Sequence, residues 1–261
     1  MKRRNTRKKI TTARIGLDPR LRNLSASIAN VRDRVAEFAL VATPDMTLRD
    51  IIAHCGTLST SGHLDVFFTD GTWTFKDGVS ISRPRVNFWS LGNNTVFERH
   101  KSATGTRPLL ELRAEEITLN GIRFNDTGTN LGPAVKVTED RCVVRNCTIE
   151  DSWRAIEVNG ADGVRVLDNH VLASRDTDYS IYVTGSSVDG IMVGNIVEQA
   201  GLTANIFFDT GSARWVIANN QTLSGKIRFT DTDGHATTSN SGSSISVVAD
   251  ENSVVSAMVF S

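Results

Sequence analysis

Short strand patterns recur along most of this chain at nearly constant spacing, and this repeat restricts the possible folds more than any other feature. Apolar residues occupy the second and fourth positions of Ala134–Val137, Ala155–Val158, Ser180–Val183, Asn205–Phe208 and Lys226–Phe229. The starts of these segments differ by 21, 25, 25 and 21 residues, and Leu109–Leu112 fits 25 residues earlier. A period of two indicates strands with one buried face.

Further short apolar strands, such as Val143-Val144 and Ile191–Val193, lie between these segments and leave no stretch of helix length, which argues against a βαβ fold. A solenoid fits instead, in which each coil pairs in parallel with its neighbours at ~4.8 Å. The register predicts two inward columns: Leu110, Val135, Ile156, Ile181, Ile206 and Ile227, then Leu112, Val137, Val158, Val183, Phe208 and Phe229. The outward column between them contains Glu111, Lys136, Glu157, Tyr182, Phe207 and Arg228.

A second series runs in step with the strands. Its members are asparagines spaced 23 to 26 residues apart, namely Asn94, Asn120, Asn146, Asn169, Asn195 and Asn220. Asparagine tolerates left-handed backbone conformations, and its amide can bond to an asparagine one coil away. The series therefore predicts a stacked turn position, with a register that leaves Gly121 as an alternative to Asn120.

The segments Asp70–Phe75, Val79–Ile81 and Val86–Phe97 resemble the first coils of the pectin-lyase-like superfamily, and the resemblance covers roughly residues 44–235. It implies a right-handed coil with three sheets. The predicted fold class is all-β, a right-handed parallel β-helix of about six to seven coils. An N-terminal amphipathic helix with a basic arm and a C-terminal β-hairpin extend it.

The charge distribution divides the chain. Residues 1–22 contain nine Lys or Arg and one acid, so the remainder has 20 basic and 28 acidic residues, a net of −8. We predict a basic arm (1–22), a helical N-terminal cap (23–60), the β-helix (61–235), and a linker with C-terminal strands (236–261). Such an arm contacts acidic partners or remains a solvated tail. The predicted anchoring residues are Lys2, Arg3, Arg4, Arg7, Lys8 and Lys9.

Two helices and a hairpin are expected at the ends. Ile28, Val31, Val35 and Phe38 lie on one helical face within residues 23–42, and Thr47 is placed to cap a second helix over residues 48–54. At the other end, residues 237–244 have the composition of a linker. Apolar runs at 245–248 and 254–260 then predict a terminal hairpin that needs cover, for example from subunit partners.

The outer face offers few candidates for chemistry. Motifs of polygalacturonase-like and pectate-lyase-like members are absent from the sequence, so Glu157, Asp209 and Arg228 are only weak catalytic candidates. Glu111 and Glu157 share a column with Lys136 between them, and an ion-pair ladder is the interpretation that we favour over a catalytic pair. Tyr182 and Phe207, beside Glu157, predict an oligomer interface first, with a glycan-binding surface or no functional role as the alternatives.

Two functions from different classes remain open. The chain resembles β-helical spikes and fibres of bacteriophage virions, which implies a structural or attachment role, a homotrimer, and a virion location after assembly in the host cytoplasm. Its partners would be other virion proteins through the arm and host surface polysaccharide. The alternative is a polysaccharide lyase or glycoside hydrolase, and a cytosolic scaffold or carbohydrate-binding module is a weaker third hypothesis.

The rest of the sequence predicts which groups and segments are absent and what state the cysteines are in. We expect no metal, no cofactor, no signal peptide and no membrane insertion. Cys55, Cys142 and Cys147 form no CxxC pair and are predicted to be reduced core residues.

Overall fold

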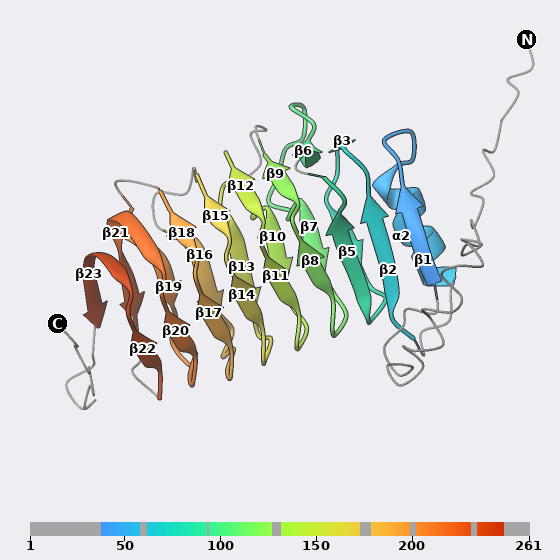
Figure 1. Cartoon of the computed structure of the whole chain (residues 1–261). Helices are drawn as coiled ribbons and strands as arrows, with labels where there is room; N and C mark the ends of the chain where they lie inside the picture. The colour runs from blue at the N-terminus through green and yellow to red at the C-terminus, as the bar shows by residue number, and fades with distance from the viewer. Residues whose placement is uncertain are drawn as a thin grey trace, which may run out of the picture.

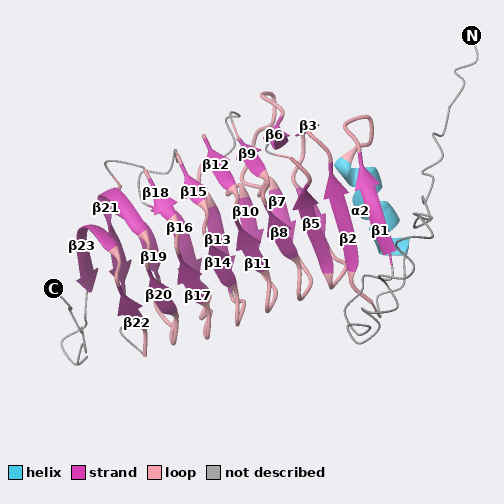
Figure 2. Ribbon diagram, in the orientation of Figure 1, coloured by secondary structure: helices cyan, strands magenta, loops and turns pink. Residues whose placement is uncertain are grey.

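The computed structural model describes residues 38–57, 62–92, 94–126, 132–172, 179–198, 202–230 and 234–247. These residues form a parallel β-solenoid in which strands from successive coils lie side by side along one axis (Figure 1). The only described helix lies at the N-terminal end (Figure 2). The predicted all-β solenoid is therefore confirmed.

Each coil contributes strands to three stacks. The first stack contains β1 (Phe38–Ala42), β2 (Leu64–Phe68), β5 (Val86–Ser90), β8 (Thr118–Asn120), β11 (Val143–Arg145), β14 (Arg165–Leu167), β17 (Ile191–Val193), β20 (Val216–Ala218) and β22 (Ala236–Thr238). The second contains β3 (Gly71–Phe75), β6 (Thr95–Arg99), β9 (Arg123–Asn125), β12 (Thr148–Glu150), β15 (His170–Val171) and β18 (Ile196–Val197). The third contains β4 (Val79–Ile81), β7 (Leu110–Leu112), β10 (Val135–Val137), β13 (Ile156–Asn159), β16 (Tyr179–Thr184) and β19 (Ala204–Phe208).

The long strand β21 (Gln221–Phe229) joins the second and third stacks. Its first part pairs with β18 and its last part with β19, so the two stacks form one 14-stranded sheet. β23 (Ser241–Val247) pairs in parallel with β21 and continues the solenoid.

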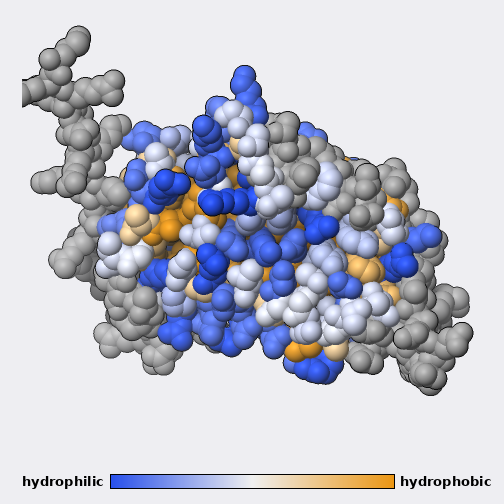
Figure 3. All heavy atoms as spheres, turned by 180° about the vertical axis from the view of Figure 1, so that it is seen from behind, coloured by the Kyte–Doolittle hydropathy of each residue, from blue (hydrophilic) through white to orange (hydrophobic). Residues whose placement is uncertain are grey.

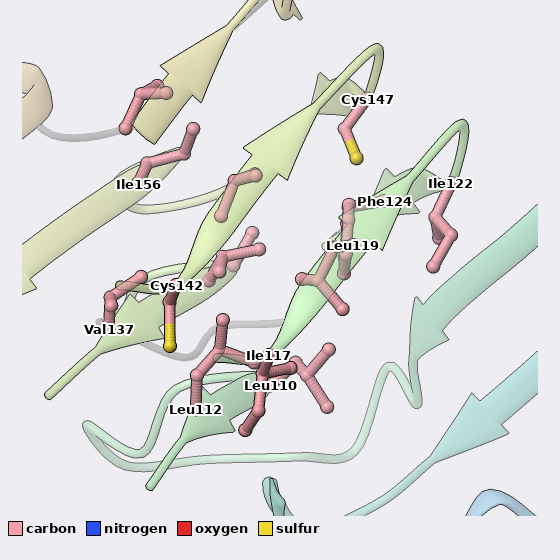
Figure 4. Close-up of a cluster of buried hydrophobic side chains, with 14 of the residues drawn as sticks. Leu110, Leu112, Ile117, Leu119, Ile122, Phe124, Val137, Cys142, Cys147 and Ile156 are labelled. Carbon is pink, nitrogen blue, oxygen red and sulfur yellow. The ribbon is translucent and has the colours of Figure 1, made fainter. Parts of the chain in front are cut away.

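The core lies inside the coils and follows the predicted columns. The pairs Val135–Ile156, Ile156–Ile181 and Ile181–Ile206 stack in register, and all four side chains are fully buried. Figure 4 shows neighbouring core side chains, with Cys142 and Cys147 among the leucines and isoleucines. Both predicted inward columns are confirmed.

The asparagine series splits into two adjacent positions. Asn146 pairs with Asn120 through its side chain (2.8 Å) and has a positive φ of 51°. Asn169, Asn195 and Asn220 lie one position further on, where they are fully buried or nearly so. There each donates backbone N–H and Nδ2 hydrogen bonds to the next amide oxygen at 2.9–3.1 Å. The predicted amide ladder is confirmed for these three residues, and Asn240 extends it.

The ends differ from prediction. The helix predicted over 23–42 is wrong at its end, because Phe38–Ala42 forms β1 and pairs with β2, burying Leu40 and Ala42; residues 23–37 lie outside the described residues. The second helix is confirmed as α2 (Leu48–Thr57), where Thr47 Oγ1 accepts a hydrogen bond from Asp50 N at 3.1 Å.

The predicted linker is also wrong. Residues 236–238 and 241–247 are strands that pair with β20 and β21, and Asn240 between them continues the amide ladder. The second half of the predicted hairpin (254–260) lies outside the described residues.

Candidate functional site

The outward column of the third stack brings most of the predicted site residues together. The register from β4 to β21 aligns Ser80, Glu111, Lys136, Glu157, Tyr182, Phe207 and Arg228. Successive strands in a sheet are ~4.8 Å apart. The predicted column is therefore confirmed, and its side chains form one continuous line along the solenoid.

Glu157 is held by two cations. Its carboxylate pairs with Lys136 Nζ at 2.9 Å and with the Arg154 guanidinium at 3.1 Å, and the residue is only 8% exposed. One coil before Lys136, Glu111 accepts a hydrogen bond from Ser80 Oγ at 2.9 Å. This arrangement is the ion-pair ladder that the alternating charges predict, at least between Lys136 and Glu157.

Tyr179, Tyr182 and Phe207 form an aromatic cluster beside Glu157. The rings of Tyr179 and Phe207 stack with centroids 4.3 Å apart, and Tyr182 lies nearly parallel to Phe207. The Arg154 guanidinium covers the Tyr182 ring at 4.7 Å. Because Tyr179 covers Phe207, Phe207 is only 8% exposed although it belongs to the outward column.

Asp209 lies one column away and accepts several hydrogen bonds. Tyr182 Oη and Thr184 Oγ1 donate to its Oδ2 at 2.5 and 3.2 Å, and Thr210 N donates to Oδ1 at 2.8 Å. Burial tends to raise the pKa of this carboxyl, but the three hydrogen bonds outweigh burial and lower the pKa. Burial, and secondly the bond to Asp209, raise the pKa of Tyr182.

Arg228 follows Phe207 in the column. Its guanidinium carbon lies 5.9 Å from the centre of the Phe207 ring, and its Nε is buried without a hydrogen-bond partner among the described residues. Glu157, Asp209 and Arg228 thus lie around the aromatic cluster, but the carboxylate of Glu157 is already engaged by cations. Whether any of the three is catalytic stays a prediction.

Tyr179 and Arg154 belong to the site but do not follow the period of two. Each lies three residues before an outward residue, Tyr182 and Glu157 respectively, because two successive residues between them are buried. An aromatic residue three residues before another aromatic was the signal available in the sequence. Both residues matter because they shield the column from solvent.

The N-terminal end of the same face is hollowed. A cavity of about 430 Å³ is lined by Ser80, Arg107, Glu111 and Arg113 among others. A second cavity, of about 390 Å³, lies beyond Arg113 and is lined by Arg85 and three glutamates. Seen from behind, most of the described surface is hydrophilic, with scattered apolar patches (Figure 3).

The thiols are not part of a site. Cys55, Cys142 and Cys147 are free and buried, as predicted. Burial raises the pKa of Cys55 to about 11 and of the other two to about 12, so thiolate is scarce at neutral pH. Within the described residues, no three His, Cys, Asp or Glu side chains are grouped to hold a metal ion.

The described part of the chain contains no helix of the length and hydropathy that crossing a membrane requires. The anchoring residues predicted in the basic arm, Lys2, Arg3, Arg4, Arg7, Lys8 and Lys9, lie outside the described residues.

Stacked parallel coils with an inward amide ladder define a class of protein, the parallel β-helix. A family model described as a right handed beta helix region matches residues 86–256, more than half of the chain. The chain therefore belongs to this family, and the handedness that the resemblance implied is confirmed.

One solved structure gives a closer comparison. The catalytic domain of a GH87 alpha-1,3-glucanase variant, in complex with tetrasaccharides, is similar with a TM-score of 0.56 and 11% sequence identity. The similar region covers 76% of this chain and 38% of the glucanase chain, so this chain spans well under half of that protein's length. At this identity the likeness concerns the fold alone. No curated protein matches the sequence.

Proposed function

We propose that this protein is a structural and attachment component of a bacteriophage virion, as a spike, a fibre or a decoration of the head or tail. Its β-helix acts as a rigid shaft, the basic arm of residues 1–22 anchors it to other virion proteins, and the aromatic cluster contacts host surface polysaccharide. The observation that supports this proposal best is the uninterrupted in-register stack whose outward acid, Glu157, is neutralised by two cations.

The physical argument concerns what the outer face is suited to do. A carboxylate paired with Lys136 and Arg154 stabilises the stack, but both of its oxygens are already engaged by these cations and are not free to contact a substrate. Stacked rings beside arginines, in contrast, resemble surfaces that bind by contact area and hydrogen bonding. The site therefore fits binding better than hydrolysis.

The test locates the protein and its anchor. Mass spectrometry of purified phage particles from the source of this sequence should detect the chain at a constant copy number. A variant lacking residues 1–22 should be missing from otherwise complete particles. Particles that never contain the full-length chain would contradict the proposal.

A polysaccharide-degrading enzyme is the second candidate. One observation favours it: the Asp209 carboxylate, with a lowered pKa, is held by Tyr182 and Thr184 one column from Glu157. Two carboxylates flanking a sugar chain are the usual arrangement for glycoside hydrolysis. Arg228 would then stabilise negative charge on the substrate.

The enzyme hypothesis is tested with soluble alpha-1,3-glucan and with capsular polysaccharide from the host. Release of reducing ends or of unsaturated products should fall at least about a hundredfold in Glu157→Gln and Asp209→Asn. Glu98→Gln, on a different stack, is the matched control. If the wild type releases products and both variants retain full turnover, the site assignment is wrong. If the wild type releases none, the attachment role is favoured.

A further inference from the structure

The outer face of the first stack carries two columns of outward side chains. The first column contains Asp65, Asn87, Thr118, Val143, Arg165, Ile191 and Val216. The second contains Val41, Phe67, Trp89, Asn120, Arg145, Leu167 and Val193. This face is distinct from the candidate site, which lies on the third stack.

Much of this face is apolar although it is open to water. Val41 and Val216 are 44% and 43% exposed, and Leu167, Ile191 and Val193 are partly exposed. The described helix α2 packs mainly against β4 of the third stack rather than against these strands. A row of apolar side chains along a flat sheet marks a surface that binds another molecule.

Two opposite charges interrupt the first column at symmetric places. Asp65 on β2 and Arg165 on β14 lie two coils before and two coils after Thr118 on β8. Arg165 is exposed and has no ion pair among the described residues. Asp65 accepts hydrogen bonds from Asn87 and Trp89, both on Oδ1, which leaves Oδ2 available.

We propose that this face binds a second copy of the same chain, related by a two-fold axis that runs along β8. The rotation reverses the order of coils, so Asp65 of each copy faces Arg165 of the other and two ion pairs form. The same rotation places Phe67 opposite Leu167. Near the ends of the contact, it covers Val41 with Val193.

The charges select this orientation over the alternative. If the two copies packed with equal coils facing each other, the two Arg165 side chains would share one coil level and the two Asp65 side chains another, and like charges close together across an interface are unfavourable. The reversed orientation also brings each Trp89 towards the Arg145 of the other copy. Within one chain these two already form a cation–π pair at 5.2 Å. The resulting assembly is a pair, unlike the homotrimer that the resemblance to spikes implies.

The size of the contact sets the expected affinity. From β1 to β17 the face extends six strand spacings, or ~29 Å, and a three-residue strand is ~10 Å long. Such a strip is small beside the ~800 Å² per partner of a standard interface. We therefore expect a dissociation constant in the micromolar range, about 1–100 μM.

Sedimentation equilibrium of the full-length chain between about 1 and 200 μM, spanning that range, tests the proposal. The mass should rise from 28.5 kDa towards twice that value. Arg165→Asp and Asp65→Arg should each raise the dissociation constant at least about tenfold. An equimolar mixture of the two variants should restore association, because both contacts between unlike variants then join opposite charges. Arg113→Asp, on an exposed turn outside this face, should associate like the wild type.

Three results would overturn the proposal: a wild type that stays monomeric or forms trimers, single variants that associate as strongly as the wild type, or a mixture that remains monomeric. Circular dichroism and melting of each variant verify its fold. Arg165→Gln removes the charge without reversing it and should weaken association less than Arg165→Asp; an unchanged constant for Arg165→Gln would also count against the ion pair.

Discussion

Charged residues occupy a left-handed backbone position at one turn of the solenoid. Arg85, Glu116, Arg141, Asp189 and Arg214 all have φ between 56° and 60°, where a side chain costs about 1 kcal/mol relative to glycine. The backbone register stacks them in one column. Their ion pairs run between coils, for example Arg85–Glu116 at 2.8 Å and Arg214–Asp189 at 2.6 Å. We infer that these pairs offset the strain of the turn.

These stacked charged residues, which we call the turn column, predict a contribution to the free energy of unfolding that is lost in acid. The hydrogen bond from Arg85, and secondly that from Arg141, lower the pKa of the Glu116 carboxyl. A lowered folded-state pKa gives stability that is present above the unfolded pKa, about 4.5, and is lost as pH falls through the folded value. The urea concentration at the midpoint of unfolding should therefore decrease as the pH is lowered below about 4.5, and this decrease should be smaller in Glu116→Gln.

Glu139→Gln is the control for Glu116→Gln, since Glu139 has no ion pair among the described residues. It should leave most of the acid-induced loss in place. An equal effect of the two variants would contradict the role of the turn column.

The Tyr182–Asp209 hydrogen bond predicts a measurable coupling. A bond to a charged group contributes about 1.5–3 kcal/mol, so Tyr182→Phe should lower the free energy of unfolding at pH 7 by about that amount. In the Asp209→Asn background the same substitution should cost less. Urea denaturation of the wild type, the two single variants and the double variant measures the coupling, and additive effects would show that the bond contributes nothing.

At the scale of strands, the period-two pattern and the ~25-residue repeat were sufficient to predict the columns, because a parallel in-register stack places equivalent residues above one another. The asparagine series was harder, since Asn146 and Asn169 occupy adjacent positions that spacing alone merges. Phe38–Ala42 satisfies a helical pattern as well as a strand pattern, and only pairing with β2 decides between them. Tyr179 was missed because Ser180 and Ile181 are both buried, which interrupts the alternation.

The amide ladder predicts a large penalty for a change in its middle. Asn195→Ala removes the acceptor of the Asn169 N–H and Nδ2 and the donor to Val166 O, all buried. Leaving such groups without partners should lower the free energy of unfolding by about 3 kcal/mol or more. Asn146→Gly, which removes one exposed bond and keeps the left-handed turn, should cost less than about 1 kcal/mol. If urea denaturation shows similar losses in the free energy of unfolding for the two variants, the amide ladder does not make the predicted contribution to stability.

Across the whole molecule, buried side chains form one cluster that extends from Leu40 to Phe229. No boundary divides this core within the described residues, so its two ends share their stability through the coils between them. The sequence predicts such a core from its repeat. It does not predict which outer face is covered, because that depends on partners as well as on the chain itself.

The continuous core predicts cooperative unfolding. Ile181→Ala, in the middle of an inward column, should cost about 2–5 kcal/mol. Trp73 near one end and Trp215 near the other are both buried and serve as fluorescence probes in variants that retain one of them. The urea midpoints reported by Trp73 and by Trp215 should shift by the same amount when Ile181→Ala is introduced. A shift at Trp215 without a shift at Trp73 would show that the ends unfold independently.

The equal geometry of successive coils also limits how such a chain can change in evolution. Duplicating or deleting a whole repeat, such as the 25 residues from Ile156 to Ser180, leaves the neighbouring ladders able to pair across the junction. Adding one residue inside a strand would instead turn the following inward side chains to the surface. The length of the solenoid can thus change only by whole coils, and each coil adds or removes ~4.8 Å.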